Sequence, residues 1–200
     1  MTNYQKIEMI IKKNKGYVTR EYVMNQDIKS WFLYDYAKRY NLVKIDNGFF
    51  AKEDWLVDEY LVYQLKYKKI IYSFYTALMF HELTDKMVDY FEVSCPHGYN
   101  VELTDKIVKH SVRNKEIYDL GVIEIETIFG NKVKVYDMEK TICDLVKNKV
   151  HIESEVYIKA IRKYIRKKDK NIFKLFKYAR IMKIEKEVNE LMEILLNDEY

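Results

Sequence analysis

Proline is nearly absent from this chain. It occurs once in 200 residues, whereas tyrosine occurs 19 times and 48% of the residues are hydrophobic. Long disordered linkers are rich in proline and poor in aromatic side chains, so this composition argues against such a linker and for ordered structure. A chain of this length can bury one sizeable core or two small ones.

Cysteine is scarce as well. The chain has two, Cys95 and Cys143, which lie far apart and outside any CxxC pair. This spacing predicts two buried, reduced thiols rather than a disulfide, as in cytosolic proteins. There is no N-terminal signal pattern, and the apolar stretch 70–80 is too short and too interrupted to cross a bilayer. We therefore expect a soluble, cytoplasmic protein without membrane contact.

The short motifs of common catalytic sites are missing too. The sequence contains no GxxxxGK(S/T), HExxH or GxSxG segment. Its four histidines are too scattered for a metal-ligand signature. Cys95-Pro96-His97 could supply two metal ligands, but the sequence has no second pair of Cys or His at a similar spacing. A nucleophilic Cys–His pair would be invisible in the sequence, and structural roles for these residues are favoured over it. We expect a protein that is not an enzyme and that has no metal and no cofactor.

A strong overall charge is also lacking, because the formal net charge is only +4. The charges are nevertheless unevenly distributed. Residues 147–183 contain 13 Lys and Arg against 3 acidic residues, whereas residues 184–200 contain 1 Lys against 6 acidic residues. Such segregation makes one surface attractive to polyanions even when the whole molecule is nearly balanced.

The N-terminal part of the chain has the pattern of three short helices and a hairpin. Apolar residues at 7, 10 and 11 mark a helix that Gly16 ends, and Thr19 is a suitable N-cap for a helix over 21–24. A third helix is expected over 29–40, with one buried face made by Ile28, Phe32, Leu33, Tyr36 and Ala37. Asn47-Gly48 between two apolar runs is a strong hairpin signal.

This order of elements is typical of a winged helix-turn-helix, which places one helix in a DNA major groove and a hairpin wing beside it. We predict such a domain over residues 1–54. The exposed residues that become candidates for contact with double-stranded DNA are Arg20, Lys29, Ser30, Trp31, Tyr34, Lys38, Arg39 and Lys44. The alternative is a protein-interaction winged helix with a solvated basic face, because 10 basic residues stand against 7 acidic ones in this segment.

Residues 55–200 indicate a second, mixed α/β domain that ends in helices. The expected helices lie within 55–70 and over 74–82, 138–147, 155–167, 171–182 and 185–197, and the expected strands over 87–95, 107–112, 121–129 and 132–136. Ser73 and Asp137 are expected N-caps, with Glu139 and Lys140 facing outward. The fold class is therefore α+β. A pair of carboxylates for acid–base chemistry could include Glu139 and Asp144, but the helix dipole and an exposed lysine account for this pattern.

A basic helical surface is expected near the C-terminal end. Its basic residues are Lys159, Arg162, Lys163, Arg166 and Lys170, joined further on by Lys174 and Lys177. The opposing apolar stripe, expected in the core, is Ile158, Ile161, Ile165, Ile172, Leu175 and Phe176. This surface is either a solvated charge run or a site for nucleic acid or an acidic partner.

Three segments, in this order, resemble the antitoxins of the AbiEi type. They are the wing at 42–51, the helix at 73–83 and the segment Val135-Tyr136-Asp137-Met138-Glu139-Lys140-Thr141-Ile142-Cys143-Asp144-Leu145. The resemblance covers essentially the whole chain, and its signature residues are Ser73, Glu139, Lys140, Thr141 and Asp144. The chain departs from the family pattern at Lys140, where arginine is usual, at Asp46-Asn47 in the wing, and at Tyr40, where glycine is usual.

The resemblance implies an antitoxin of a bacterial type IV toxin–antitoxin pair linked to abortive phage infection. Such a protein represses its own operon by binding promoter repeats through the winged helix. Its C-terminal domain, here 55–200, counters a nucleotidyltransferase-like toxin without a stable complex. We expect a monomer in solution, and leave open cooperative binding on DNA.

Two other functions stay open. A stand-alone winged-helix transcriptional regulator would have a C-terminal domain that senses a ligand or a partner, and a pocket lined by tyrosines would favour it. An enzyme acting on the toxin or on a nucleic acid would need a cleft that gathers a histidine with a carboxylate, for example His81 or His97 near Asp144.

Overall fold

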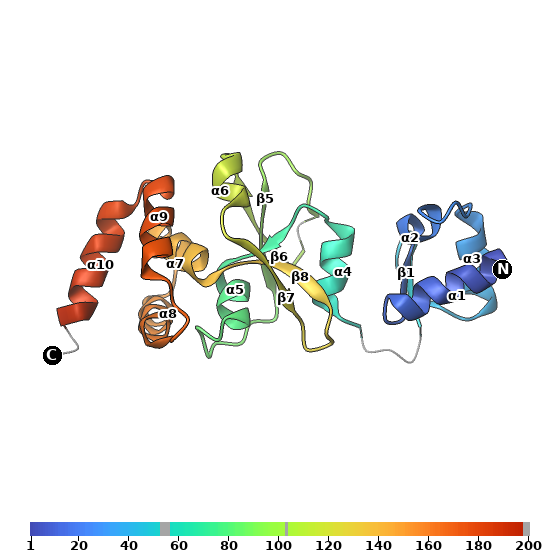
Figure 1. Ribbon diagram of the computed structural model, residues 1–200, viewed down its shortest axis with the longest axis horizontal. Coiled ribbons are helices and arrows are strands. Elements are labelled where there is room, and N and C mark those ends of the chain that lie inside the picture. The colour runs from blue at the N-terminus through green and yellow to red at the C-terminus, as the bar shows by residue number, and fades with distance from the viewer. Residues whose placement is uncertain (53–56, 103, 198–200) are drawn as a thin grey trace. The chain divides into compact units, whose positions relative to one another are not determined.

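The computed structural model describes residues 1–52, 57–102 and 104–197, and side chains as far as Glu193. The chain forms two compact units, Met1–Lys66 and Tyr67–Tyr200 (Figure 1). Both contain helices and a sheet, which confirms the α+β class. Within these described ranges, no helix is both long enough and apolar enough to cross a bilayer.

Up to residue 52, the first unit combines three helices with a three-stranded antiparallel sheet of order β1-β3-β2. Its elements are α1 (Asn3–Lys13), β1 (Tyr17–Thr19), α2 (Arg20–Met24), α3 (Trp31–Arg39), β2 (Val43–Asp46) and β3 (Phe49–Ala51). The expected helices and hairpin are confirmed, with α3 two residues shorter at its start. Strand β1 was not predicted, because three residues between a glycine and an N-cap are too few to show a periodicity.

Local signals in the sequence explain where these elements begin. Thr2 caps α1 in a capping box with Gln5, and the Thr19 hydroxyl accepts a hydrogen bond from the Tyr22 N–H at the start of α2. The core of this unit is built by the apolar faces of the three helices and by Val18 and Phe50 of the sheet. The arrangement leaves the outer side of α3 exposed.

Helix α4 (Glu59–Lys66) belongs to the first unit, so the unit extends past the predicted boundary at residue 54. Leu61, Val62 and Leu65 pack against a small cluster of the sheet, Tyr17, Phe49 and Ala51. The Asp58 N–H donates a hydrogen bond of 2.7 Å to the Tyr17 hydroxyl. This helix covers a sheet face that would otherwise expose apolar side chains, which the sequence pattern of residues 1–54 alone does not reveal. Residues 53 and 54, at the end of the predicted first domain, and Trp55 and Leu56, at the start of the predicted second one, lie outside the described residues.

The second unit is built around a mixed five-stranded sheet of order β6-β5-β4-β8-β7. Its first elements are β4 (Ile71–Tyr72), α5 (Phe74–Phe80), β5 (Phe91–Pro96), β6 (Ile107–Val112), α6 (Lys115–Asp119), β7 (Val122–Glu126) and β8 (Lys132–Tyr136). Strands β5 and β6 run parallel, as do β4 and β8, whereas β7 and β8 form the expected hairpin. The sequence did not predict β4 and α6, which are only two and five residues long.

Helices α7 (Met138–Lys147), α8 (Ser154–Arg166), α9 (Ile172–Met182) and α10 (Glu185–Asn197) follow, with a 3-10 turn at Lys149–His151. They gather at the C-terminal end of the second unit (Figure 1). For these four helices each expected boundary is confirmed to within one residue, whereas α5 ends two residues before its expected end at 82. Asp137 caps α7 by accepting a hydrogen bond from the Lys140 N–H, as predicted. One residue of the predicted apolar stripe is wrong, because Ile158 is 48% exposed.

Candidate nucleic-acid interface and a basic cavity

The outer side of α3 carries a stripe of three residues at helical spacing. Trp31, Tyr34 and Lys38 are exposed, whereas Leu33, Tyr36 and Ala37 are buried on the opposite side of the helix. The Trp31 ring stacks on Phe32 with the ring centroids 3.7 Å apart, which holds the indole along the helix surface. This stripe offers aromatic and basic groups to whatever meets α3.

The hairpin turn between β2 and β3 lies against this stripe. The Tyr34 hydroxyl donates to Asn47 Oδ1 at 3.1 Å, and the Arg20 N–H donates to the Gly48 carbonyl at 2.6 Å. Gly48 has a φ of +71°, and a Cβ added there would lie 3.0 Å from Arg20 Cβ. The turn is therefore packed tightly between the start of α2 and the exposed side of α3, so one surface includes parts of all three elements.

The remaining predicted DNA contacts divide into two groups. Lys29 and Lys44 are exposed, and Ser30 is the N-cap of α3 without a side-chain capping bond. Arg39 is different, because its Nε lies 2.8 Å from Asp35 Oδ2 and its guanidinium lies 5.3 Å from the centre of the Tyr4 ring. Arg39 is one residue past the stripe and is held toward α1, but its side chain stays 63% exposed, so its contact with DNA stays a prediction.

Two acidic residues near this surface have cationic partners. Asp35 pairs with Arg39, and Asp46 Oδ2 lies 3.3 Å from Lys66 Nζ. The Asn47 N–H and, to a smaller extent, Lys66 lower the pKa of Asp46. These pairs reduce the negative potential beside the wing, which is a condition for approach of a polyanion.

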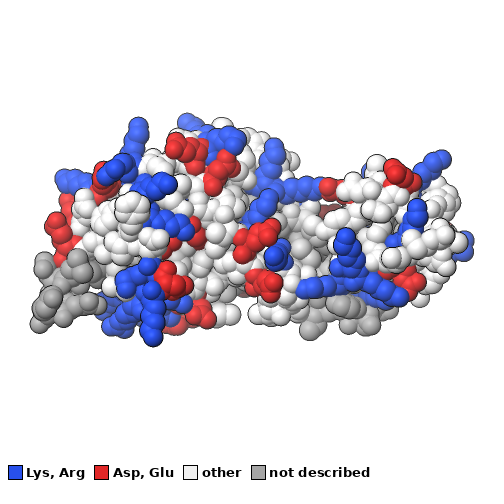
Figure 2. All heavy atoms as spheres, in the orientation of Figure 1, with Lys and Arg blue, Asp and Glu red and all other residues white. Residues whose placement is uncertain are grey.

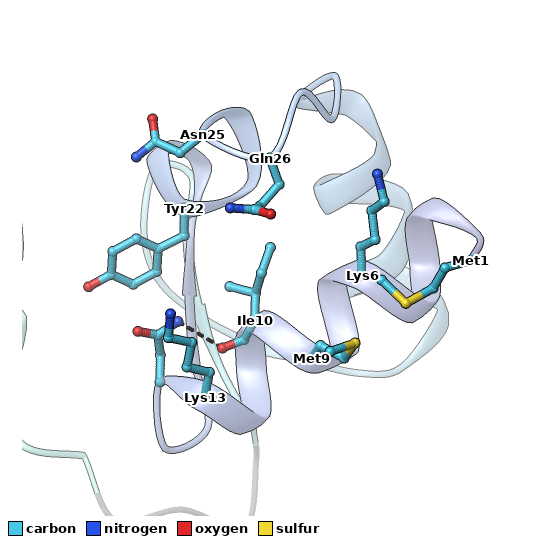
Figure 3. A pocket seen from close by; sticks show the side chains of 9 residues that line it. Met1, Lys6, Met9, Ile10, Lys13, Tyr22, Asn25 and Gln26 are labelled. Carbon is cyan, nitrogen blue, oxygen red and sulfur yellow. Dashed lines mark hydrogen bonds between the residues drawn. The ribbon is translucent and has the colours of Figure 1, made fainter.

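A separate hollow of about 490 Å³ lies between α1 and α2. Figure 3 shows Met9, Ile10 and Tyr22 around it, with Lys6 and Lys13 on α1. None of the predicted DNA contacts lines it, and its lining contains no histidine, cysteine or carboxylate. It therefore offers mainly apolar contact, with two lysines at its side.

The predicted basic helical surface is interleaved with acidic partners. Lys159 Nζ lies 2.7 Å from Glu155, and Lys163 Nζ lies 2.5 Å from Asp85. Lys170 Nζ donates to the Lys167 carbonyl, and Arg162 and Arg166 are exposed. Figure 2 likewise shows Asp and Glu among the Lys and Arg side chains of the face drawn. The net positive potential of this surface is therefore smaller than the count of basic residues suggests.

Helix α7 overturns one prediction of the sequence analysis. Glu139 and Lys140 were expected to face outward, but they are 3% and 1% exposed. Lys140 Nζ lies 2.7 Å from both carboxylate oxygens of Asp144, one helical turn further on, and 4.1 Å from the centre of the Tyr136 ring. Asp144 is thus the ion-pair partner of Lys140 on the same helix. Burial raises the pKa of Asp144, and the Lys140 ammonium opposes that shift.

The other signature residues make structural contacts. Glu139 Oε1 accepts hydrogen bonds from the Asn171 N–H and the Tyr164 hydroxyl, which ties α7 to the start of α9 and to α8. The Thr141 hydroxyl donates to the Asp137 carbonyl at 2.8 Å, and the Ser73 hydroxyl oxygen accepts a bond from the Ser94 hydroxyl. These bonds satisfy buried polar groups, as a stable core requires.

A cavity of about 500 Å³ opens in the second unit at the carboxyl end of β6. Its polar lining comes from β6, the segment before α6 and α7, and includes Lys109, His110, Arg113, Lys140, Asp144 and Lys147. His110 Nε2 lies 3.3 Å from Glu92 Oε1, and the His110 ring lies against Phe74 with the centroids 4.0 Å apart. The sheet and α7 thus bring a histidine and a carboxylate to one cavity.

The histidine in this cavity is not one that the sequence suggested. His81 Nε2 lies 2.7 Å from the Tyr136 carbonyl, and His97 Nδ1 lies 3.2 Å from the Ser111 hydroxyl, so neither approaches Asp144 through a hydrogen bond. His110 and the neighbouring Lys109 and Arg113 were missed. The sequence signal for these residues is their position near the end of a strand. That position indicates a ligand site only once β6 is known to lie parallel to β5.

Comparisons with known proteins name no relative: no family model matches the chain, and no curated protein matches it. Among the residues that the structure describes, no group of three or more His, Cys, Asp or Glu could hold a metal ion. The argument for function therefore depends on the geometry of the α3 surface and of the cavity.

Proposed function

We propose that the first unit is a winged-helix domain that binds double-stranded DNA, and that the protein is the autorepressor and antitoxin of a type IV toxin–antitoxin operon. The observation that carries the DNA-binding part is the convergence of the exposed α3 stripe with the hairpin turn and Arg20. A helix with an exposed aromatic and basic face beside a hairpin fits a major groove with a wing alongside.

The candidate DNA-contact residues differ in chemistry, which supports a different role for each on DNA. Lys29 and Ser30 precede the first turn of α3, where backbone N–H groups and a basic side chain favour a phosphate. Trp31 and Tyr34 lie where a groove-bound helix meets base edges, because their side chains are exposed on the outer side of α3. Arg20, Lys38 and Lys44 are the further phosphate contacts in this proposal.

The antitoxin part has separate support, namely the resemblance of three segments to AbiEi-type proteins. Two of these segments contribute Ser73, Lys140 and Asp144 to the second unit, and Lys140 and Asp144 line its cavity. In this proposal the second unit counters a nucleotidyltransferase-like toxin without a stable complex. The paired charges of α8 favour this reading over a second DNA-binding surface.

The test is binding of the full chain to DNA from immediately upstream of its gene, measured by fluorescence anisotropy at several salt concentrations. Lys38→Glu removes a cation from the α3 stripe, and Lys13→Glu is a matched control, since both lysines lie in the last turn of a helix. Each phosphate contact contributes a slope of about −0.9 to the dependence of log K on log salt concentration. We expect Lys38→Glu to weaken binding at least tenfold and to reduce the slope by about 1, with little change in Lys13→Glu.

Three results would count against this assignment. One is equal loss in both variants, which would indicate a general effect of charge. Another is unchanged binding in Lys38→Glu. The third is the absence of any sequence-specific binding by the folded protein, which would favour a protein-interaction winged helix. Co-expression with the adjacent gene product tests the antitoxin role, and we expect the full chain to restore growth.

A second candidate function is favoured by one observation, the cavity in the second unit. A stand-alone transcriptional regulator would use that cavity to sense a ligand. The cavity is lined by basic residues rather than by the tyrosines that the sequence suggested for such a regulator. The two candidates differ in one assay, because only the antitoxin protects cells from a toxin encoded beside it.

A further inference from the structure

The cavity at the end of β6 gathers cations from separate elements. Lys109 comes from β6, Arg113 follows that strand, and Lys147 lies in the last turn of α7. No carboxylate in the described part of the chain lies within ion-pair distance of these three. Some basic residues elsewhere on this unit do have acidic partners, as Lys159 and Lys163 have. The mouth of the cavity thus holds three cations that form no ion pair among the described residues.

The floor of the cavity is a buried ion pair. Lys140 and Asp144 neutralise each other at 2.7 Å, with side chains that are 1% and 10% exposed. A buried pair contributes weakly to stability, because desolvation offsets much of its attraction. It does supply fixed donors at the bottom of a concave surface. Because this pair carries no net charge, it does not reduce the positive potential of Lys109, Arg113 and Lys147 at the mouth of the cavity.

Glu92 holds the side wall in place. One of its oxygens accepts a hydrogen bond of 2.7 Å from the Tyr75 N–H, and the other lies 3.3 Å from His110 Nε2. Among the described residues, this carboxylate is the hydrogen-bond partner of His110, so the other ring nitrogen remains able to bond a ligand. A carboxylate that orients a histidine in this way fixes which nitrogen is presented.

Backbone strain lies at the same wall. Phe74 has a φ of 45°, which is a rare conformation for a residue with a large side chain. Glu92 and Thr76 hold it, since the Tyr75 N–H bonds Glu92 and the Glu92 N–H bonds the Thr76 hydroxyl. Strain held by surrounding hydrogen bonds is typical of ligand sites. Phe74 and the His110 ring in contact with it form an apolar and aromatic wall.

We propose that this cavity binds a phosphate monoester of nucleotide size. The phosphate would lie among Lys109, Arg113 and Lys147, because a doubly charged anion matches three uncompensated cations and Arg favours phosphate geometry. The organic part would lie against Phe74 and His110. The carboxyl end of parallel strands is where α/β sheets commonly bind ligands, and about 500 Å³ is within the usual range for such sites.

Isothermal titration of the full chain tests this with four probes: AMP, GMP, inorganic phosphate and adenosine. We expect at least one nucleotide to bind, inorganic phosphate to bind more weakly, and adenosine not to bind. Arg113→Gln and Lys147→Gln should each weaken nucleotide binding at least tenfold. Both side chains are exposed, so neither change threatens folding. Lys106→Gln is the matched control, because Lys106 is exposed just before β6 and does not line the cavity.

Several outcomes would overturn the proposal. If adenosine binds as tightly as AMP, the phosphate group does not contribute to recognition. If inorganic phosphate binds as tightly as the nucleotides, the nucleoside part does not contribute. Equal loss in Lys106→Gln would indicate nonspecific charge. Absence of binding by every phosphate probe to protein with unchanged circular dichroism would also refute it. The result is independent of DNA binding, since the titration contains no DNA.

Discussion

Removal of one partner of the buried Lys140–Asp144 pair should destabilise the second unit strongly. In Lys140→Met the Asp144 carboxylate loses the ammonium group that lies 2.7 Å from both of its oxygens, while the helix around it stays buried. Breaking a buried pair in this way typically costs about 3–5 kcal/mol, because an uncompensated charge is left in the core. Replacing both residues, as in Lys140→Met with Asp144→Leu, should be close to neutral by the same reasoning.

The two units allow the effect to be localised. Both tryptophans, Trp31 and Trp55, precede Tyr67, the first residue of the second unit, so tryptophan fluorescence should follow the first unit, whereas far-ultraviolet circular dichroism follows both. In urea titrations, Lys140→Met should shift only the dichroism transition of the second unit. Lys147→Met is the matched control, since Lys147 is exposed on the same helix, and it should change the free energy of unfolding by less than about 0.5 kcal/mol.

The pH dependence gives this prediction a second check. Burial raises the pKa of Asp144 in the folded state above its unfolded value of 3.8, so the folded protein binds the proton more tightly. Stability from this group therefore falls as pH rises from the unfolded pKa through the folded one. Removing Lys140 should raise the folded pKa further, so the deficit of Lys140→Met should shrink as the pH is lowered. A deficit below about 1 kcal/mol at pH 7, or one independent of pH, would refute the reasoning.

Two further predictions concern other parts of the molecule. Gly48→Ala should destabilise the first unit by more than about 1 kcal/mol in fluorescence-detected urea titrations, because the φ of Gly48 is +71° and a Cβ there would lie 3.0 Å from Arg20 Cβ. The same substitution should weaken DNA binding. If it changes neither stability nor DNA binding, the turn is not packed as tightly as described. Native protein at pH 7.5 should resist alkylation by iodoacetamide, since burial raises the pKa of Cys143 to about 12 and also raises that of Cys95. Mass spectrometry should find both thiols modified only in urea, and rapid modification of the folded protein would contradict their burial.

Short-range signals in the sequence were sufficient for most element boundaries. Thr19, Asp137 and Asn171 each accept a backbone hydrogen bond at the start of a helix, and Asn47-Gly48 forms the predicted turn. These features depend on neighbours a few residues away, so they can be recognised without knowledge of the fold. The exposed side of α3 followed in the same way from its period, and the two buried free thiols followed from the spacing of the cysteines and the lack of a CxxC pair.

The cavity could be predicted only in part. Lys140 and Asp144 were noted as signature residues, but Lys140 was assigned to the surface because a lysine one residue outside the apolar face of a helix is usually solvated. His110, Lys109 and Arg113 were not singled out. Their approach to α7 brings together two segments that lie far apart along the chain, the end of β6 and the helix.

The sequence by itself determined the order of helices and strands, the caps and turns that bound them, and the aromatic and basic stripe of α3. Each of these depends on residues within about one or two helical turns of one another. Tertiary structure alone decided that α4 covers the first sheet, that the Arg39 guanidinium lies near the Tyr4 ring, and that Lys140 is buried. The reason is physical: burial and ion pairing depend on which distant segments exclude water from a side chain, and local periodicity carries no information about those segments.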